Sequence, residues 1–177
     1  MQFFIGIVPP EEYKHSIMKF QQKWKNHRIM NAVEPHLTLK AQGGLAPDKK
    51  WIDEIKKVCK TFPSFSVTIS KPEFFGEDIL YLSVKSPELL KLHETIIHVV
   101  SPSEELIKKY YELKDFIPHI TLGKVYYGLS KNDLIEMKAL AEKELSPYPT
   151  FKVSVVRIYA EVSPGKYKKY MDLQLKD

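Results

Sequence analysis

Two short stretches of the chain have almost the same sequence, and each carries a histidine and a threonine. They are Pro35–Leu39 (PHLTL) and Pro118–Leu122 (PHITL). In a β-strand, side chains at positions i and i+2 point to the same face. His36 and Thr38 therefore share one face of the first segment, and His119 and Thr121 share one face of the second. The aliphatic residues between them point the other way, toward a core, so each segment resembles the floor of a cleft.

Two histidines that face one small volume are suited to general acid–base catalysis. One imidazole can take a proton from an attacking oxygen while the other gives a proton to a leaving oxygen, because the pKa of histidine is close to neutrality. Each threonine hydroxyl can donate a hydrogen bond to a phosphate oxygen. A phosphoryl centre would thus find two proton-transfer groups, His36 and His119, and two hydrogen-bond donors, Thr38 and Thr121.

The repetition of the motif makes it specific. A single His-x-Thr in a strand carries little information, whereas two copies share the same proline and aliphatic neighbours. A zinc site is the competing interpretation, but two histidines are too few, and no third ligand recurs beside both motifs. The chain also lacks a glycine-rich phosphate loop and a G-x-S-x-G elbow. We therefore expect no metal and no cofactor.

Composition sets broad limits on the function. The 177 residues favour one domain or two small lobes, and 44% hydrophobic residues are enough to bury a core. The net charge of +5 mildly favours an anionic partner such as a phosphate ester or nucleic acid, although it equally fits a merely basic protein. The lone Cys59 excludes an intramolecular disulfide framework. No apolar run is long enough to span a membrane and the N-terminus is typical of a first strand, so we expect a cytoplasmic location.

Hydrophobic periodicity predicts the same order of elements in two halves of the chain. The first half contains a strand at 2–8, a helix from Pro10 to about 28, the first His-Thr strand at 35–42, a helix at 47–62 and a strand at 65–69. The second contains a strand at 79–84, a helix at 87–100, the second His-Thr strand at 118–127 and a helix from Ser130, with Asp133 completing a capping box. A hairpin of 151–161 and 167–175 closes the chain. Residues 101–114 form either a short helix from Ser103 or a loop over the cleft.

The spacing of landmarks agrees between the two halves. His119 follows His36 by 83 residues, and Ile79 follows Gln2 by 77 residues. This similarity predicts an internal duplication, with halves of about 1–76 and 79–177 in a single bilobal domain. An approximate two-fold relation between the halves would bring the two His-Thr faces together in a groove, where ligand sites are common.

The paired motifs resemble those of the 2H (two-histidine, HxTx) phosphoesterase superfamily, which includes RNA 2′,3′-cyclic phosphodiesterases and bacterial 2′-5′ RNA ligase-like proteins. The stretch Pro118–Lys124 (PHITLGK) is the closest match, and the order of elements fits over most of the chain. The sequence is most similar to the YjcG-like branch. The resemblance implies an α+β fold of two pseudo-symmetric lobes, with antiparallel sheets lining a central groove and helices on the outer faces. It also implies metal-independent catalysis by His36 and His119, with Thr38 and Thr121 holding the phosphate.

The resemblance extends to a basic residue after the second motif. Many relatives carry one there, and Lys124 is the candidate in this chain. Strict alternation would turn Lys124 away from Thr121, but a bulge at Gly123 could redirect it. We expect His36 to be the proton donor and His119 the acceptor, and these roles can exchange between cleavage and ligation. Aromatic residues that could stack a base, or could pack in the core or rim, are Phe74, Phe75, Tyr126 and Tyr127.

These observations predict a phosphoric diester hydrolase. We expect it to hydrolyse a cyclic or 2′-5′ phosphodiester, such as the 2′,3′-cyclic phosphate of RNA or of a nucleotide, with no obligatory protein partner. One alternative is a 2′-5′ RNA ligase activity, which is the reverse chemistry. The other is an RNA-binding module that keeps the groove but turns over little.

Overall fold

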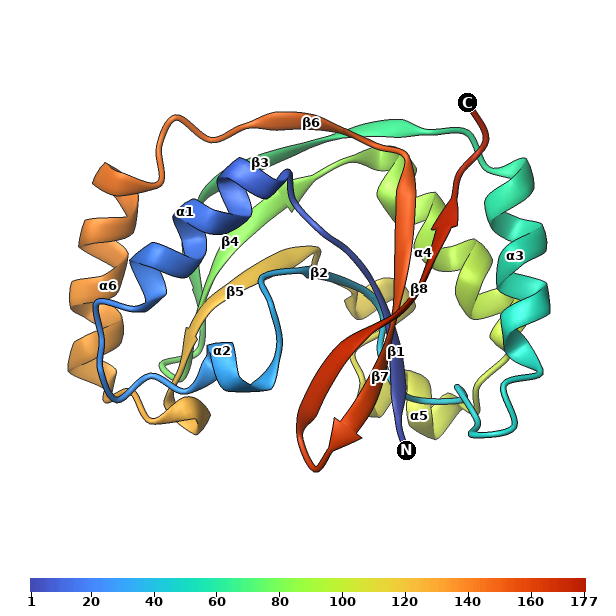
Figure 1. Ribbon diagram of the computed structural model, residues 1–177, viewed down its shortest axis with the longest axis horizontal. Coiled ribbons are helices and arrows are strands. Elements are labelled where there is room, and N and C mark those ends of the chain that lie inside the picture. The colour runs from blue at the N-terminus through green and yellow to red at the C-terminus, as the bar shows by residue number, and fades with distance from the viewer.

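The computed structural model describes residues 1–177 and combines six α-helices with eight β-strands (Figure 1). The helices are α1 (Glu11–Gln21), α2 (Ile29–Ala32), α3 (Trp51–Thr61), α4 (Pro87–Val100), α5 (Glu104–Lys109) and α6 (Lys131–Glu144), with short 3-10 turns at η1 (Leu113–Asp115) and η2 (Val125–Tyr127). The strands are β1 (Phe3–Ile7), β2 (Leu37–Lys40), β3 (Phe65–Phe75), β4 (Ile79–Lys85), β5 (His119–Lys124), β6 (Thr150–Val153), β7 (Val155–Ser163) and β8 (Lys166–Gln174). The predicted α+β class is therefore confirmed.

All eight strands join in one antiparallel sheet, in the order β6-β3-β4-β5-β2-β1-β7-β8. The sequence led us to expect separate sheets in the two lobes. Pairing of β2 with β5, through Leu37 and Ile120, links them into one curved sheet. The strands that carry the two His-Thr motifs are thus neighbours at its centre.

The helices cover the apolar side of the sheet in two groups. Helix α6 contacts β3, β4 and β5, and α1 contacts β5; both lie at the left end of the molecule in Figure 1. Helix α4 contacts β2 and β3 and packs on α3, which lies at the right end. Buried side chains from both groups form one continuous hydrophobic cluster that includes Leu37, Leu39, Ile120 and Leu122. The alternate residues of both motifs therefore face the core, as their pattern predicts.

Local sequence signals account for several helix ends. The Ser86 hydroxyl accepts a hydrogen bond from the Leu89 amide at the start of α4, and Pro87 occupies the first turn. Ser130 and Asp133 form the predicted capping box of α6. The open question over residues 101–114 is settled in favour of a short helix, because α5 follows Ser103 and is capped by its hydroxyl.

The element order repeats as expected, with β1-α1-β2-α3-β3 followed by β4-α4-β5-α6-β6. The strand pairing does not follow this repetition. As β3 pairs with β4, its equivalent β6 would be expected to pair with β1; instead β6 pairs with β3, and β7 lies beside β1. The internal duplication itself stays a prediction. None of the helices combines the length and the apolar character needed to cross a membrane.

Three sequence-based boundaries are wrong. The strand expected at 65–69 continues to Phe75 as β3 and pairs with β4 along this extension. The stretch 151–161 is not one strand of a hairpin, because its pairing changes partner around Ser154, where β6 ends at one edge of the sheet and β7 begins near the other. The first helix does not reach residue 28, since α1 ends at Gln21. As a consequence His27, expected on a helix surface, is buried in the turn before α2.

Candidate active site

The register of β2 and β5 brings the two motifs together. Leu37 lies directly opposite Ile120, and both point into the core. Extending this antiparallel register by one residue each way places His119 opposite Thr38 and Thr121 opposite His36. Residues opposite one another point to the same face and have Cα atoms about 4.5–5.5 Å apart. The four motif side chains therefore occupy one small area of the sheet face that turns away from the core.

His36 is held by a main-chain carbonyl. Its Nδ1 lies 2.8 Å from the carbonyl oxygen of Glu34, and its Nε2 lies 3.1 Å from the hydroxyl of Thr38. Since a carbonyl only accepts, Nδ1 carries the proton and Nε2 is a base that accepts from the threonine. Burial, with a smaller contribution from the nearby His119, lowers the pKa of His36 to about 4, against the effect of the Glu34 carbonyl. His36 is therefore neutral at pH 7.

His119 has the same arrangement on the facing strand. Its Nδ1 donates to the carbonyl of Ile117 at 2.7 Å, so that its Nε2 is the free base. The rings of Phe75 and Tyr81 meet the imidazole edge to face, with ring centroids 5.0 Å and 5.3 Å away. Burial lowers the pKa of His119, and so does the positive charge of Lys124. Phe75 is thus the one of the four aromatic candidates that contacts a motif histidine.

A bulge in β5 determines where Lys124 points. Against β4, Thr121 pairs with Tyr81, but Gly123 pairs with Leu80, so Leu122 is the extra residue. The shift returns Lys124 to the face that carries Thr121 and His119. Burial lowers the pKa of the Lys124 ammonium. The predicted bulge is therefore present, with Leu122 and not Gly123 as its extra residue.

Glycine at 123 allows close packing beside α6. A Cβ built there would lie 2.7 Å from Sδ of Met137 and 2.8 Å from Cδ1 of Leu129. Both distances are shorter than real Cβ contacts, so any other residue at this position would displace these side chains.

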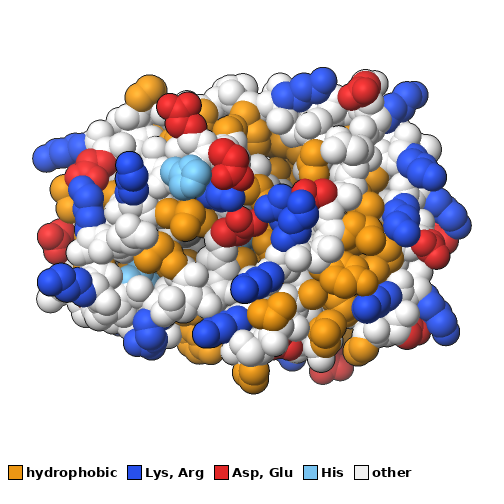
Figure 2. Space-filling view, viewed as in Figure 1, with side chains coloured by type: hydrophobic (Ala, Val, Ile, Leu, Met, Phe, Trp, Pro, Cys, Tyr) orange, Lys and Arg blue, Asp and Glu red, His pale blue; other side chains and the backbone are white.

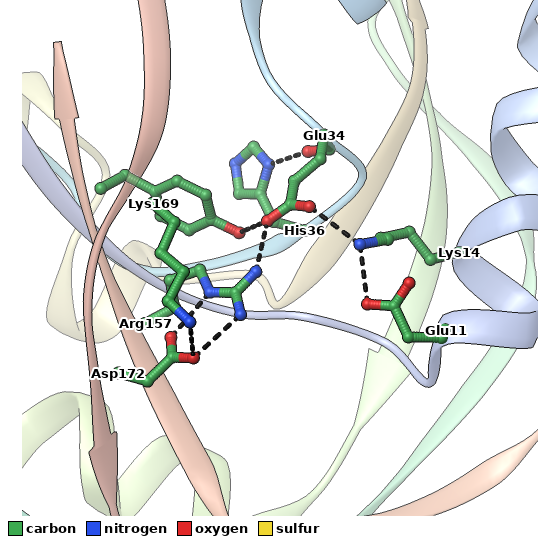
Figure 3. Close-up of polar contacts among 8 residues, drawn as sticks. Glu11, Lys14, Glu34, His36, Arg157, Lys169 and Asp172 are labelled. Carbon is green, nitrogen blue, oxygen red and sulfur yellow. Dashed lines mark hydrogen bonds and ion pairs between the residues drawn. The ribbon is translucent and has the colours of Figure 1, made fainter. Parts of the chain in front are cut away.

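The structure also shows a polar network that sequence reasoning missed. The Glu34 carboxylate accepts hydrogen bonds from Arg157 (2.7 Å), Tyr159 (2.8 Å) and Lys14 (2.9 Å) (Figure 3). Arg157 donates two further bonds to Asp172, at 2.7 and 3.0 Å. These groups come from α1, β7 and β8, and Lys14 on α1 is more than 100 residues from Arg157 and Asp172 in the sequence. No local motif can therefore reveal the network. The one local signal that could have revealed part of the network is the i, i+2 spacing of Arg157 and Tyr159, which puts both side chains on the same face of a strand.

The network orients the catalytic candidate His36 indirectly. The side chain of Glu34 is fixed by three donors, and the carbonyl of the same residue receives the Nδ1 proton of His36. The rings of Phe4 and Tyr159 complete the setting, with centroids 4.9 Å and 5.5 Å from the imidazole. The imidazole is therefore restrained by hydrogen bonding on one side and by packing on the other.

A small cavity of about 20 Å³ lies beside His36 and Thr121. Gln21, at the end of α1, also lines it; its amide nitrogen donates to the Leu122 carbonyl at 3.1 Å, while its side-chain oxygen is buried without a partner. This volume can hold one water molecule, and an unsatisfied acceptor is the group that a buried water would serve.

The other reactive side chains of the chain lie outside this site. Cys59 is buried among apolar residues, which raises its pKa to about 11. His93 is structural, since its Nδ1 donates to the Leu39 carbonyl and its Nε2 accepts from the Leu113 amide. Tyr126 and Tyr127 contact each other beyond β5, and neither ring contacts a motif histidine. Nowhere do three or more histidine, cysteine or acidic side chains gather in a way that could hold a metal ion.

Comparisons with known proteins agree with this geometry. The chain matches the family model of the 2′-5′ RNA ligase superfamily over residues 9–161. Similar solved structures include TT0787 of Thermus thermophilus, with 17% identity and a TM-score of 0.68, and E. coli LigT complexed with 3′-AMP, with 18% identity and a TM-score of 0.64. In both cases 99% of this chain and 98% of the other are covered. A third, described as a phosphoesterase, is 16% identical with a TM-score of 0.61 and covers 99% of both chains.

At these identities the likeness to solved structures shows the fold alone, and no curated protein matches the chain. Membership of the YjcG-like branch stays a prediction. The family model, in contrast, spans most of the sequence and includes both motifs. The chain belongs to the 2′-5′ RNA ligase superfamily, whose members are 2H phosphoesterases.

Proposed function

We propose that the protein hydrolyses a cyclic or 2′-5′ phosphodiester, with the 2′,3′-cyclic phosphate of RNA or of a nucleotide as the model substrate. The observation that carries the proposal is the central β2–β5 ladder, in which Leu37 pairs with Ile120, so that the two His-Thr pairs flank this contact on one face of the sheet. The binding of 3′-AMP and of phosphate by E. coli LigT, which shares the fold, supports a nucleotide phosphate as the ligand class.

The hydrogen bonds of the two histidines support a role in proton transfer. Both imidazoles donate Nδ1–H to a carbonyl, so both Nε2 atoms are acceptors. That of His119 is free, and that of His36 accepts from the Thr38 hydroxyl, a contact that a bound substrate would replace before a proton is exchanged. A phosphate anion bound between them favours the charged form of imidazole and draws one proton into the pair. Burial lowers the pKa of both rings, and only for His36 is the shift large, to about 4, so we place that proton on His119. We therefore assign His119 as donor and His36 as acceptor, the reverse of the assignment made from sequence.

Bond changes and proton transfers balance in the hydrolytic step. A water oxygen forms a bond to phosphorus as it gives a proton to Nε2 of His36, and the bond from phosphorus to the leaving oxygen breaks as that oxygen takes a proton from His119. The Thr38 hydroxyl turns from Nε2 of His36 to a non-bridging oxygen, the Thr121 hydroxyl donates to the other, and Lys124 adds positive charge. Each proton transfer contributes on the order of 10²–10⁴-fold in rate. The same groups run in reverse would serve a ligase.

The test is turnover of 2′,3′-cyclic AMP with EDTA present. His36→Ala and His119→Ala should each lower kcat by at least about 10²-fold, while His15→Ala, an exposed histidine on α1, should leave it unchanged. Wild-type rates in either motif variant would refute the two-histidine mechanism. A mixture of RNA strands with 2′,3′-cyclic phosphate and 5′-hydroxyl ends measures ligation in the same preparation.

The leaving group distinguishes the two histidines. A p-nitrophenyl phosphodiester releases p-nitrophenolate, which needs no proton, so this substrate should restore activity to the variant that lacks the donor and not to the variant that lacks the acceptor. Restoration in His119→Ala supports the present assignment. Restoration in His36→Ala instead would return the roles to those expected from sequence.

A further inference from the structure

The last residue of α1 places a buried amide beside the candidate active site. The side chain of Gln21 is only 1% exposed, and it lines the cavity of about 20 Å³ together with His36 and Thr121. Its Nε2 lies 3.1 Å from the carbonyl of Leu122. Because a carbonyl accepts and cannot donate, the amide nitrogen must face β5 and the amide oxygen must turn away from it. Oε1 of Gln21 is therefore directed toward the opposite wall of the cavity, the segment that precedes β2.

Pro35 explains why a side chain pairs with β5 at this point. Continuing the register of Leu37 with Ile120 by two residues places Pro35 opposite Leu122. Proline has no N–H, so this part of the chain has no donor to offer the Leu122 carbonyl, and the β2–β5 ladder ends. Gln21 supplies the missing donor. The cavity is the gap that remains where the two strands separate.

This gap is suited to a neutral occupant. The one carboxylate in its wall, that of Glu34, is paired with Lys14 and Arg157 (Figure 3). Figure 2 shows charges of both signs intermixed over this face of the molecule. The volume is sufficient for one water, which needs two to four polar partners. Oε1 of Gln21, buried without a partner in the protein, is the first of them.

The hydroxyl of Thr121 is the second. Its counterpart on β2, Thr38, hydrogen-bonds Nε2 of His36, whereas the Thr121 hydroxyl makes no such bond within the protein. A water in the cavity has two protons to donate, one to Oε1 of Gln21 and one to Oγ1 of Thr121. The threonine oxygen then accepts from the water, so its own proton points elsewhere, toward the face that carries the two histidines.

On the basis of the proposed function, we propose that Gln21 is a positioning residue for Thr121 and acts through one water molecule held between them. The water orients the Thr121 hydroxyl so that its proton is directed at a non-bridging oxygen of the substrate phosphate. Gln21 is buried and does not itself contact the substrate.

A crystal structure that resolves ordered water tests the geometry without reference to activity. One water should lie within about 3.0 Å of both Oε1 of Gln21 and Oγ1 of Thr121. It should be lost in Gln21→Met, which keeps the length of the side chain and removes both polar groups. A dry cavity in the wild type, or a water that contacts Gln21 and not Thr121, would overturn the inference.

The functional test is a double-mutant cycle. Gln21→Met should lower kcat/KM for 2′,3′-cyclic AMP about fivefold, the effect of one hydrogen bond. In a Thr121→Val background it should cause no further loss, because no hydroxyl remains to be oriented, whereas in Thr38→Val the full loss should persist. Gln22→Met, at the exposed neighbouring position, is the matched control and should leave the rate unchanged. A loss as large in Thr121→Val as in the wild type, which a distorted β5 would cause, would refute the role.

Binding of 3′-AMP separates this inference from the proposed function. This nucleotide carries the phosphate but has no cyclic ester to cleave, and its affinity is measured by calorimetry. If the wild type turns over no cyclic substrate, the proposed activity fails, and the same cycle is then read in 3′-AMP affinity. Weaker binding by Gln21→Met that disappears in the Thr121→Val background would support the positioning role. Equal affinity of the wild type and Gln21→Met would count against it.

Discussion

A buried ion pair next to the first motif allows a quantitative test of what holds the groove in shape. Lys40 ends β2, two residues after Thr38, and its ammonium lies 2.7 Å from a carboxylate oxygen of Glu112. The same ammonium donates to the carbonyls of Gly43 (2.6 Å) and Ala41 (2.8 Å). Both members of the pair are almost fully buried, with Lys40 0% and Glu112 2% exposed. The pair thus fixes the segment after α5 to the strand that carries Thr38.

The substitution Lys40→Met removes the cation and leaves a buried carboxylate unpaired. Breaking a buried pair in this way costs about 3–5 kcal/mol. Domains are typically stable by only about 5–15 kcal/mol, so the free energy of unfolding should fall by about a fifth or more. The double substitution Lys40→Met/Glu112→Leu removes both charges, and apolar replacement of a whole pair is often neutral. We therefore expect the double variant to be more stable than Lys40→Met alone.

The assay is urea unfolding followed by the fluorescence of Trp24 and Trp51. The control is Lys57→Met, which breaks a pair with Glu54 on the surface of α3 and should change stability little. The reasoning would be refuted if Lys40→Met cost no more than Lys57→Met, or if adding Glu112→Leu lowered the stability of Lys40→Met further.

Three further predictions concern the site itself. Burial lowers the pKa of both histidines, to about 4 for His36, so kcat/KM for 2′,3′-cyclic AMP should be greatest below pH 6.5 and fall through the neutral range as the donor form is lost; a flat profile from pH 6 to 8 would contradict this. Gly123→Ala should destabilise the protein by about 1–3 kcal/mol in urea unfolding, because the new methyl overlaps Met137, and unchanged stability would show that the contact relaxes freely. Glu34→Gln keeps the carbonyl that holds His36 but loses its ion pairs, so kcat should fall about tenfold with KM nearly constant. Burial alone would raise the pKa of Glu34, but hydrogen bonds from Lys14, Arg157 and Tyr159 lower it overall. The Glu34 carboxylate therefore stabilises the fold above about pH 4.5, and this stabilisation disappears as the pH falls. The loss of stability in acid should be smaller in Glu34→Gln, which has no carboxylate to protonate at this position.

The sequence was most informative where local chemistry decides the structure. Period-two alternation around His36 and His119 correctly placed their neighbours in the core, and the cap at Ser130 gave the start of α6. The two motifs could be predicted to meet because they recur at equivalent places in the element order. The bulge that redirects Lys124 was anticipated from the glycine, whose lack of a side chain permits it.

The parts that could not be predicted depend on long-range pairing. Nothing local marks Ser154 as the point where the chain leaves one edge of the sheet for the other, since residues on both sides alternate alike. The Glu34 network is invisible for a similar reason, because an acidic residue beside a histidine motif gains meaning only when Arg157 and Tyr159 arrive from β7. The proposed assignment of proton donor and acceptor rests on the burial of each ring, which is a property of the folded molecule.

The placement of β6 and β7 has a consequence for how the molecule assembles during synthesis. The segment 150–163 completes both flanks of the sheet, pairing Thr150 with Thr68 and Ala160 with Phe3. During translation, both histidine motifs are therefore synthesised before β6 and β7, the strands that pair with β3 and β1. Contacts between residues so distant in sequence form slowly, and an unpaired strand is prone to join another chain. The complete sheet should accordingly form only after residues 150–163 have been synthesised.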